Sequence, residues 1–155
     1  MHSRVFQVSK SPIKEENLIT ESRYYEWHHP DYVCQVENDK NIIADLEGFQ
    51  TATKGIKVDT EARTITVTSK KEYFEEKLEK FRALAEELST ITQDEFMSSK
   101  SSYKFSDLED LYNNKYSFYI DDNDEYCGLT TLDSWVRYSE ENKTYYIGSI
   151  FDYHY

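Results

Sequence analysis

The 155-residue sequence is poor in cysteine, proline and glycine, with two, two and four of them, and each scarcity argues against a class of protein. Cys34 and Cys127 lie far apart in a chain without an export signal, so we expect reduced thiols and no disulfide framework. Four glycines leave little material for a phosphate-cradling loop, and no nucleophile-elbow or zinc-protease motif is present. An enzyme is therefore the less favoured class, and we expect no cofactor.

Long apolar runs are also missing from the sequence. No stretch approaches the roughly 20 apolar residues that cross a bilayer, and residues 1–6 lack the apolar core and cleavage site of a signal peptide. We therefore expect a cytoplasmic protein with no membrane partner.

Basic side chains are scarce too: 18 lysines and arginines stand against 30 aspartates and glutamates, which makes the net charge −12. Residues 15–47 hold nine acidic and two basic side chains, and residues 94–125 hold nine and three, whereas residues 48–82 are mildly positive. A field of this sign repels phosphates and attracts basic surfaces. We expect a basic protein surface as the partner and no direct binding to nucleic acid.

Tyrosine is abundant, with 14 residues beside eight phenylalanines and two tryptophans. Interfaces favour Tyr and Trp anchors inside a polar rim, so aromatic and acidic residues of the two acidic segments become candidates. The predicted partner-binding set is Tyr24, Tyr25 and Trp27 with the acidic residues Asp107, Glu109, Asp110, Asp121, Asp122 and Asp124. The alternative, that the charge serves only solubility, stays open.

Alternation of apolar and polar residues predicts the strands. The clearest case is a hairpin formed by residues 55–59 and 63–68. Its apolar side chains should face the core: Ile56, Val58, Ile65 and Val67. Further runs rich in β-branched and aromatic residues predict strands at 4–9, 117–121 and 144–155. Residues 14–35 contain both helical and extended signals and are left open.

One long amphipathic helix is predicted to begin after Ser69, which forms a capping box with Glu72. We expect its apolar stripe to pack on the sheet; the stripe is Phe74, Leu78, Phe81, Ala85 and Leu88. A short helix is predicted within residues 39–49, with Gly48 as its stop signal. Further short helices are predicted to begin near residues 92, 106 and 130. The prediction is a single α+β domain over residues 1–155, with a mainly antiparallel sheet and a central hairpin.

Metal ligands of the right chemical types occur in two places. His28, His29 and Cys34, near Asp31, suit zinc, but the paired spacing of a structural site is missing. Residues 121–125 suggest a calcium loop, yet neither frame places both the glycine and the oxygen ligands correctly. We therefore predict no metal site from these segments.

Acid–base chemistry has one further candidate pair. Asp152 and His154 share a face of the last predicted strand, because they are two residues apart. The alternative function is accordingly a small enzyme or metal-assisted catalyst that uses His28, His29 and His154.

The two ends of the chain are similar to the ends of other proteins. Residues 3–9, followed by Pro12 and Ile13, and residues 145–155 resemble the ends of small acidic bacterial and mobile-element proteins of unassigned function. This resemblance implies no activity, cofactor or catalytic residue. In composition the chain is similar to bacterial immunity proteins and phage-encoded inhibitors. The leading hypothesis is an acidic protein-binding module, an inhibitor, immunity-type or anti-defence factor that could mimic nucleic acid.

Overall fold

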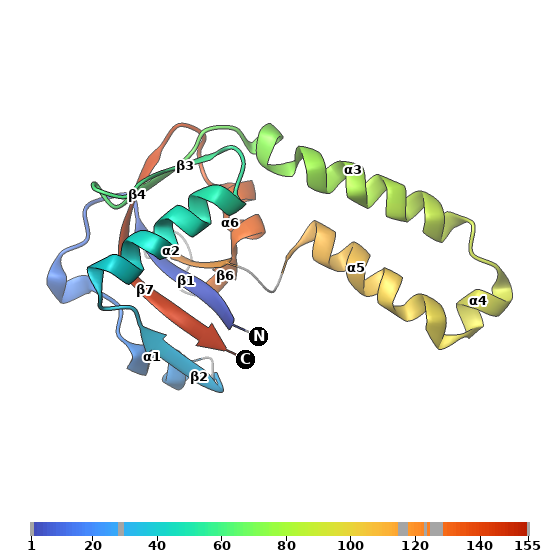
Figure 1. Ribbon diagram of the computed structural model, residues 1–155, viewed down its shortest axis with the longest axis horizontal. Coiled ribbons are helices and arrows are strands. Elements are labelled where there is room, and N and C mark those ends of the chain that lie inside the picture. Colours follow the sequence, from blue (N-terminus) through green and yellow to red (C-terminus); the bar gives the residue numbers. More distant parts are fainter. Residues whose placement is uncertain (1, 28–29, 115–117, 123, 125–128, 155) are drawn as a thin grey trace.

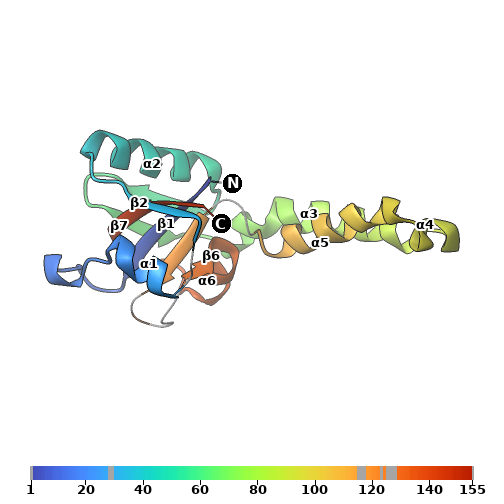
Figure 2. The same ribbon diagram turned by 90° about the horizontal axis from the view of Figure 1, so that it is seen from below.

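The structure is a computed structural model that describes residues 2–27, 30–114, 118–122, 124 and 129–154, except for the side chains of Trp27 and Lys100. Figure 1 shows two parts, a body built around a β-sheet and a helical arm that projects from it. In the view of Figure 2 the arm extends outward from the body as a narrow group of helices. His28, His29 and Cys127 lie outside the described residues.

The body contains one seven-stranded sheet with the order β3-β4-β7-β1-β5-β6, and β2 pairs with β7 off this path. The strands are β1 (His2–Ser9), β2 (Tyr32–Gln35), β3 (Ile56–Asp59), β4 (Thr64–Val67), β5 (Phe118–Asp122), β6 (Leu129–Thr131) and β7 (Thr144–His154). Strands β1 and β5 run parallel, and the other described pairs are antiparallel. This arrangement confirms the predicted α+β class with a mainly antiparallel sheet.

Strand β7 is central because it uses both of its edges. It pairs with β1 along one edge, and along the other it pairs with β4 at residues 144–146 and with β2 at residues 151–154. Buried residues lie on both faces of β1 and β7, and most of the large ones are apolar or aromatic. The prediction that residues 144–155 contain a paired strand is confirmed, and the central place of this strand is a finding of the structure.

Four helical segments surround the sheet: η1 (Glu15–Asn17), α1 (Glu21–Trp27), α2 (Asp39–Ala52) and α6 (Leu132–Tyr138). On one face, Phe6 of β1 packs in a cluster with Phe49 of α2 and Trp135 of α6. On the other face, Val5 packs with Tyr24 of α1 and Phe151. Phe6 and Val5 serve opposite layers because successive side chains of a strand alternate between its faces.

The predicted hairpin is present, with Ile56 opposite Val67 and Val58 opposite Ile65. Three of these side chains are buried and Val58 is half-buried. Gly55, just before the hairpin, has a positive φ of 68°, and an added Cβ there would collide with the carbonyl oxygen of Ser69. A glycine is needed because the start of the long helix lies directly against this turn.

The helical arm consists of α3 (Lys70–Ser89), α4 (Gln93–Met97), η2 (Ser99–Ser101) and α5 (Ser102–Tyr112). Ser69 caps α3 as predicted, because its side chain accepts a hydrogen bond from the Glu72 amide. Thr92 and Glu95 form a complete capping box at α4. The structure corrects two boundaries: α2 continues through Gly48 to Ala52, and α5 begins at Ser102, four residues before the predicted start at Ser106.

The prediction that the apolar stripe of α3 packs on the sheet is wrong beyond the first turn. Tyr73 and Phe74 reach the core cluster, but Leu78 is 46% exposed and Phe81 is only half-buried. The rest of α3 projects beyond the body and lies against α5 instead. Periodicity shows that a helix has an apolar face, and it does not show which element covers that face.

Candidate interaction surface on the helical arm

The arm has almost no core of its own. Tyr73 is the one buried side chain of α3, and among the described residues of α4 and α5 none is buried. Helices α3 and α5 lie against each other, and the leucines that they carry here are only half-buried: Leu84, Leu88, Leu108 and Leu111. Two antiparallel helices can cover only one side of each other, so part of their apolar surface stays in contact with water.

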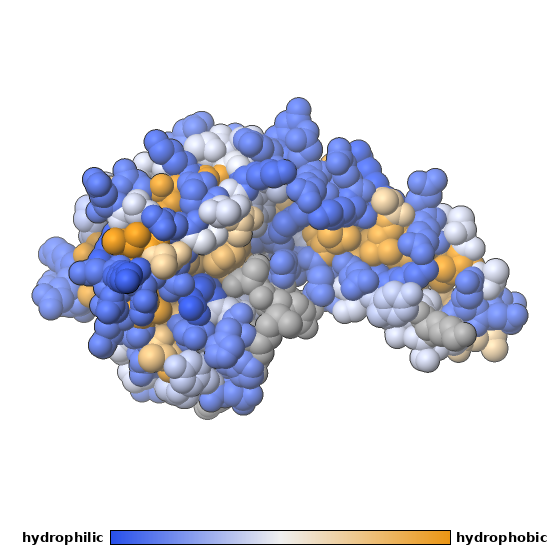
Figure 3. Space-filling model, viewed as in Figure 1, coloured by the Kyte–Doolittle hydropathy of each residue, from blue (hydrophilic) through white to orange (hydrophobic). Residues whose placement is uncertain are grey.

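Large apolar side chains are exposed on the arm more than elsewhere. Among the described residues, eleven large apolar side chains are exposed, and six of them belong to the arm: Leu78, Phe96, Met97, Tyr103, Phe105 and Tyr112. Figure 3 shows hydrophobic surface along the arm between hydrophilic residues. Exposed apolar surface rimmed by polar residues is typical of a surface that binds another molecule.

The distal half of the arm, residues 86–110, is also strongly acidic. It holds seven acidic side chains against Lys100 and Lys104. Lys104 is paired with Glu87 at 2.5 Å, and this hydrogen bond raises the pKa of the Lys104 ammonium. Exposed aromatic residues and an excess of acidic over basic side chains thus occur together on residues 86–110, which we call the distal arm.

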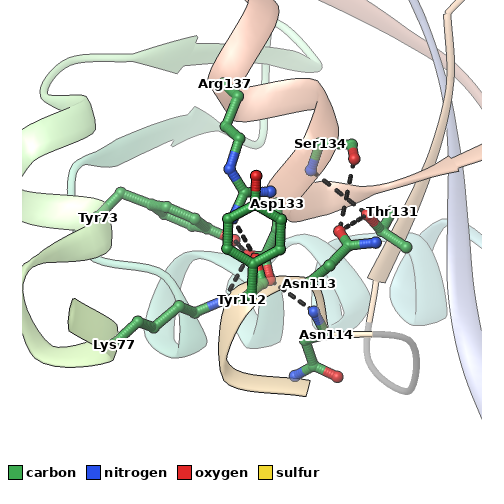
Figure 4. A network of polar contacts seen from close by, with 9 residues as sticks. All are labelled: Tyr73, Lys77, Tyr112, Asn113, Asn114, Thr131, Asp133, Ser134 and Arg137. Atoms are coloured by element: carbon green, nitrogen blue, oxygen red, sulfur yellow. Dashed lines mark hydrogen bonds and ion pairs between the residues drawn. The ribbon is translucent and has the colours of Figure 1, made fainter. Parts of the chain in front are cut away.

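The base of the arm is anchored by a single buried carboxylate, Asp133 of α6, shown in Figure 4. Tyr73 donates its hydroxyl proton to Asp133 at 2.7 Å, and Lys77 of the same helix forms an ion pair with it. The backbone amide of Asn114, just after α5, donates to the other carboxylate oxygen at 2.7 Å. Both ends of the arm are therefore held by one side chain of the body.

A second set of contacts surrounds this anchor. Asn113 accepts hydrogen bonds from Thr131 at 2.5 Å and from Ser134 at 3.4 Å. Arg137 donates to the Tyr112 carbonyl oxygen, and its guanidinium lies 4.2 Å from the centre of the Tyr112 ring. These contacts hold the C-terminal end of α5 against α6.

The predicted acidic residues fall into two groups. Asp107 and Glu109 of α5 are exposed and Asp110 is half-buried, so all three can contribute to a binding surface on the arm. Asp121 and Asp122 of β5 are 1% and 4% exposed, and the prediction that they form an exposed acidic surface is wrong. They lie inside because distant donors satisfy them.

These donors come from elements on both sides of the sheet. Asp121 accepts a hydrogen bond from Tyr24 and pairs with Arg23, while Asp122 accepts one from the Trp135 indole at 3.1 Å. Asp124 is exposed, but its carboxylate accepts hydrogen bonds from the Ser9 hydroxyl and the Lys10 amide. Asp121, Asp122 and Asp124 therefore hold the fold together.

The predicted aromatic anchors of α1 are also corrected in part. Tyr24 is fully buried and cannot contact a partner. Tyr25 is 44% exposed, and its hydroxyl accepts a hydrogen bond from the Val33 amide at 3.3 Å. The side chain of Trp27 lies outside the described residues.

Two buried tyrosines should make the protein sensitive to alkali. Burial first, and then the neighbouring Asp121 and Asp133, raise the pKa of Tyr24 and Tyr73 far above the usual value. Phenols of the unfolded chain ionise near pH 10, whereas Tyr24 and Tyr73 of the folded protein stay neutral there. Above about pH 10 the unfolded state therefore gains stability by losing protons, and the folded state loses its advantage; below about pH 10 that advantage is fully present. We expect unfolding free energy to fall by about 1.4 kcal/mol per pH unit for each tyrosine.

Urea titrations at a series of pH values from 8 to 11 measure this loss, and Tyr24→Phe should remove the share of one phenol from the slope. Tyr138, which is 74% exposed, provides the control Tyr138→Phe, whose slope should match that of the wild type. Equal slopes in all three proteins would contradict the assignment.

A polar cluster occupies the end of the sheet where β1, β7 and β2 lie side by side. His2 lies opposite His154 and Arg4 opposite Asp152 in the β1–β7 register. The Nδ1 atom of His2 is 3.0 Å from Asp152, and Arg4 contacts the same carboxylate at 2.7 Å. Asp152 and His154 thus share a face, as predicted, and their neighbours are now known.

Of the three histidines in the metal-assisted alternative, only His154 lies among the described residues, so that alternative is not tested. His154 is 3.8 Å from Asp31, and its ring centre is 5.3 Å from that of His2. Within the described part of the chain, no group of three or more His, Cys, Asp or Glu side chains is arranged to hold a metal ion. Cys34 is a free and exposed thiol.

The distal arm is the feature that inspection of the sequence missed. Phe96 and Met97 form a short apolar pair in a polar stretch, and Tyr103 and Phe105 follow soon after. Four large apolar residues between two capping signals, too few for a core, could have indicated an exposed helical tip.

Comparisons with protein-family models, with curated protein sequences and with solved structures found no match to this chain. Across the described residues, no helix has both the length and the apolar composition needed to cross a membrane.

Proposed function

We propose that the protein is a binding module that engages a basic surface of another protein through the distal arm, and acts as an inhibitor or immunity-type factor. The observation that carries this proposal is the coincidence of exposed apolar residues and unneutralised acid on one projecting element. Phe96 and Met97 are 67% and 74% exposed, which is unusual for side chains of this size. They would supply the apolar centre of the interface, with carboxylates as its polar rim.

The charge of the arm selects the kind of partner. Opposite electrostatic fields speed diffusional encounter, whereas a like-charged surface is repelled. The partner is therefore basic, and a protein that normally binds nucleic acid fits this description, with the arm as a mimic of phosphate charge. The proposal places this interaction in the cytoplasm, where Cys34 stays reduced.

The first test is site-specific photo-crosslinking in a lysate of the native host. A photoreactive amino acid at Met97 should yield a specific adduct with a basic protein, because Met97 lies in the proposed interface. The matched control carries the same group at Tyr138, which is equally exposed at 74% but lies on the body. Equal adducts from both positions, or an acidic protein at Met97, would overturn the proposal.

The second measurement is the association rate with the identified protein. Reversing the charges at Asp107, Glu109 and Asp110 should slow association about tenfold or more at low salt, and added salt should have the same effect on the wild type. If neither the charge reversals nor added salt changed the association rate, the acidic charge would serve only solubility.

A further inference from the structure

A groove of about 840 Å³ lies where the arm joins the body. Its walls are the last residues of α2, the first three turns of α3 and the second half of α5, with Phe118 and Leu132 among the apolar lining. Leu84 and Leu111 continue the apolar lining onto the arm. The groove is thus continuous with the surface proposed above as the interface.

Each lysine of this groove is already paired with a carboxylate of the protein itself. Lys54 and Lys80 both contact Glu76, at 3.3 and 2.7 Å, and these hydrogen bonds lower the pKa of the Glu76 carboxyl. Lys77 is paired with the buried carboxylate of Asp133. An anionic ligand would have to compete with these carboxylates for each lysine.

The remaining acids of the groove have no such partners. Glu72, Asp107 and Asp110 line the groove, and within the described chain their carboxylates make no ion pair and accept no hydrogen bond. The C-terminal end of α2, which carries partial negative charge, also borders the groove at Thr53. Counted together with Asp133, five carboxylates stand against three lysines at this groove, so its net charge is negative.

We infer that this groove receives a lysine or arginine side chain from a basic, amphipathic segment of the protein partner. The inference rests on the proposed function and deepens it. The aliphatic stem of such a side chain suits the apolar lining at Leu111 and Leu132, while its cationic head reaches Asp107 and Asp110. An apolar neighbour in the same segment would pack on Leu84.

The probe is a twelve-residue peptide that alternates arginine and leucine, added to the full ¹⁵N-labelled chain and followed by NMR. We expect the amides of Lys54, Asp110 and Leu111 to shift, and the glutamate–leucine counterpart to leave them unchanged. The isosteric double variant Asp107→Asn/Asp110→Asn should weaken peptide binding about fivefold to tenfold, because it removes two of the three carboxylates of the groove that have no partner.

The matched control is Glu75→Gln/Glu79→Gln, which removes the same charge from exposed positions of α3 outside both the groove and the distal arm. Equal affinities in the two double variants, or peptide-induced shifts confined to residues 96–105, would overturn the groove assignment while leaving the distal arm as the interface. A peptide seated in the groove, without any crosslink from Met97 to a basic protein, would instead overturn the proposed function.

Discussion

Asp133→Asn should destabilise the protein by about 3 kcal/mol, because it removes the charge from a buried, hydrogen-bonded ion pair. Asp133 is 1% exposed and accepts from Tyr73, Lys77 and the Asn114 amide, whereas an asparagine offers only one acceptor oxygen. The expected loss lies at the lower end of the usual range, since Lys77 can turn toward solvent. Urea denaturation measures it.

The same variant should loosen the arm at its base. Hydrogen exchange at the Asn114 amide and in the first turns of α3 should accelerate more than exchange in the sheet. Glu76→Gln is the control, since it breaks exposed ion pairs with Lys54 and Lys80 and should hardly move the denaturation midpoint. A wild-type midpoint for Asp133→Asn would show that the arm is held by other contacts.

Gln7→Leu is expected to have a comparable effect on the other side of the molecule. Gln7 is fully buried, and its side-chain oxygen accepts hydrogen bonds from the amides of Ile19 and Ser149, both at 3.1 Å. Its amide group donates to the Asn17 carbonyl at 2.8 Å. Leucine fits the volume but leaves two buried amides unpaired, at a cost of about 1–3 kcal/mol each.

Gln50 offers a matched comparison, because it braces β3 in the same manner through Ile56 and Val58. It is half-buried beside an edge strand, so water can replace its hydrogen bonds in Gln50→Leu. Denaturation midpoints should fall clearly further for Gln7→Leu than for Gln50→Leu. Equal midpoints would mean that residues 13–19 are not held to the sheet by Gln7.

The local parts of this fold were predictable and the distant pairings were not. The hairpin of β3 and β4 follows from alternation within about a dozen residues, and the cap at Ser69 follows from a four-residue pattern. The burial of Asp121 depends on Tyr24 and Arg23, almost a hundred positions away. The residues next to Asp121 in the sequence do not show that these hydrogen-bond donors lie beside it in the fold.

The candidate site also has one property that the sequence predicts and one that depends on the fold. The acidic character of α5 was correctly read from composition, because the charges of Asp107, Glu109 and Asp110 do not depend on the fold. The projection of α3 depends on what the body leaves uncovered, and its stripe of apolar residues is equally compatible with a sheet or a second helix. The predicted exposure of Tyr24 was wrong because the residues that cover it, Phe151 and Tyr153, lie far away in the sequence.

The place of β7 in the sheet has a consequence for the order in which the protein can assemble. It is the last strand of the described chain, yet β1, β2 and β4 all pair with it. A nascent chain that has not yet released residues 144–154 from the ribosome has no partner for β2 and no sheet for the β3–β4 hairpin to join. The α3–α5 pair depends on contacts close in sequence and can form earlier, so the body is completed only after synthesis has passed β7.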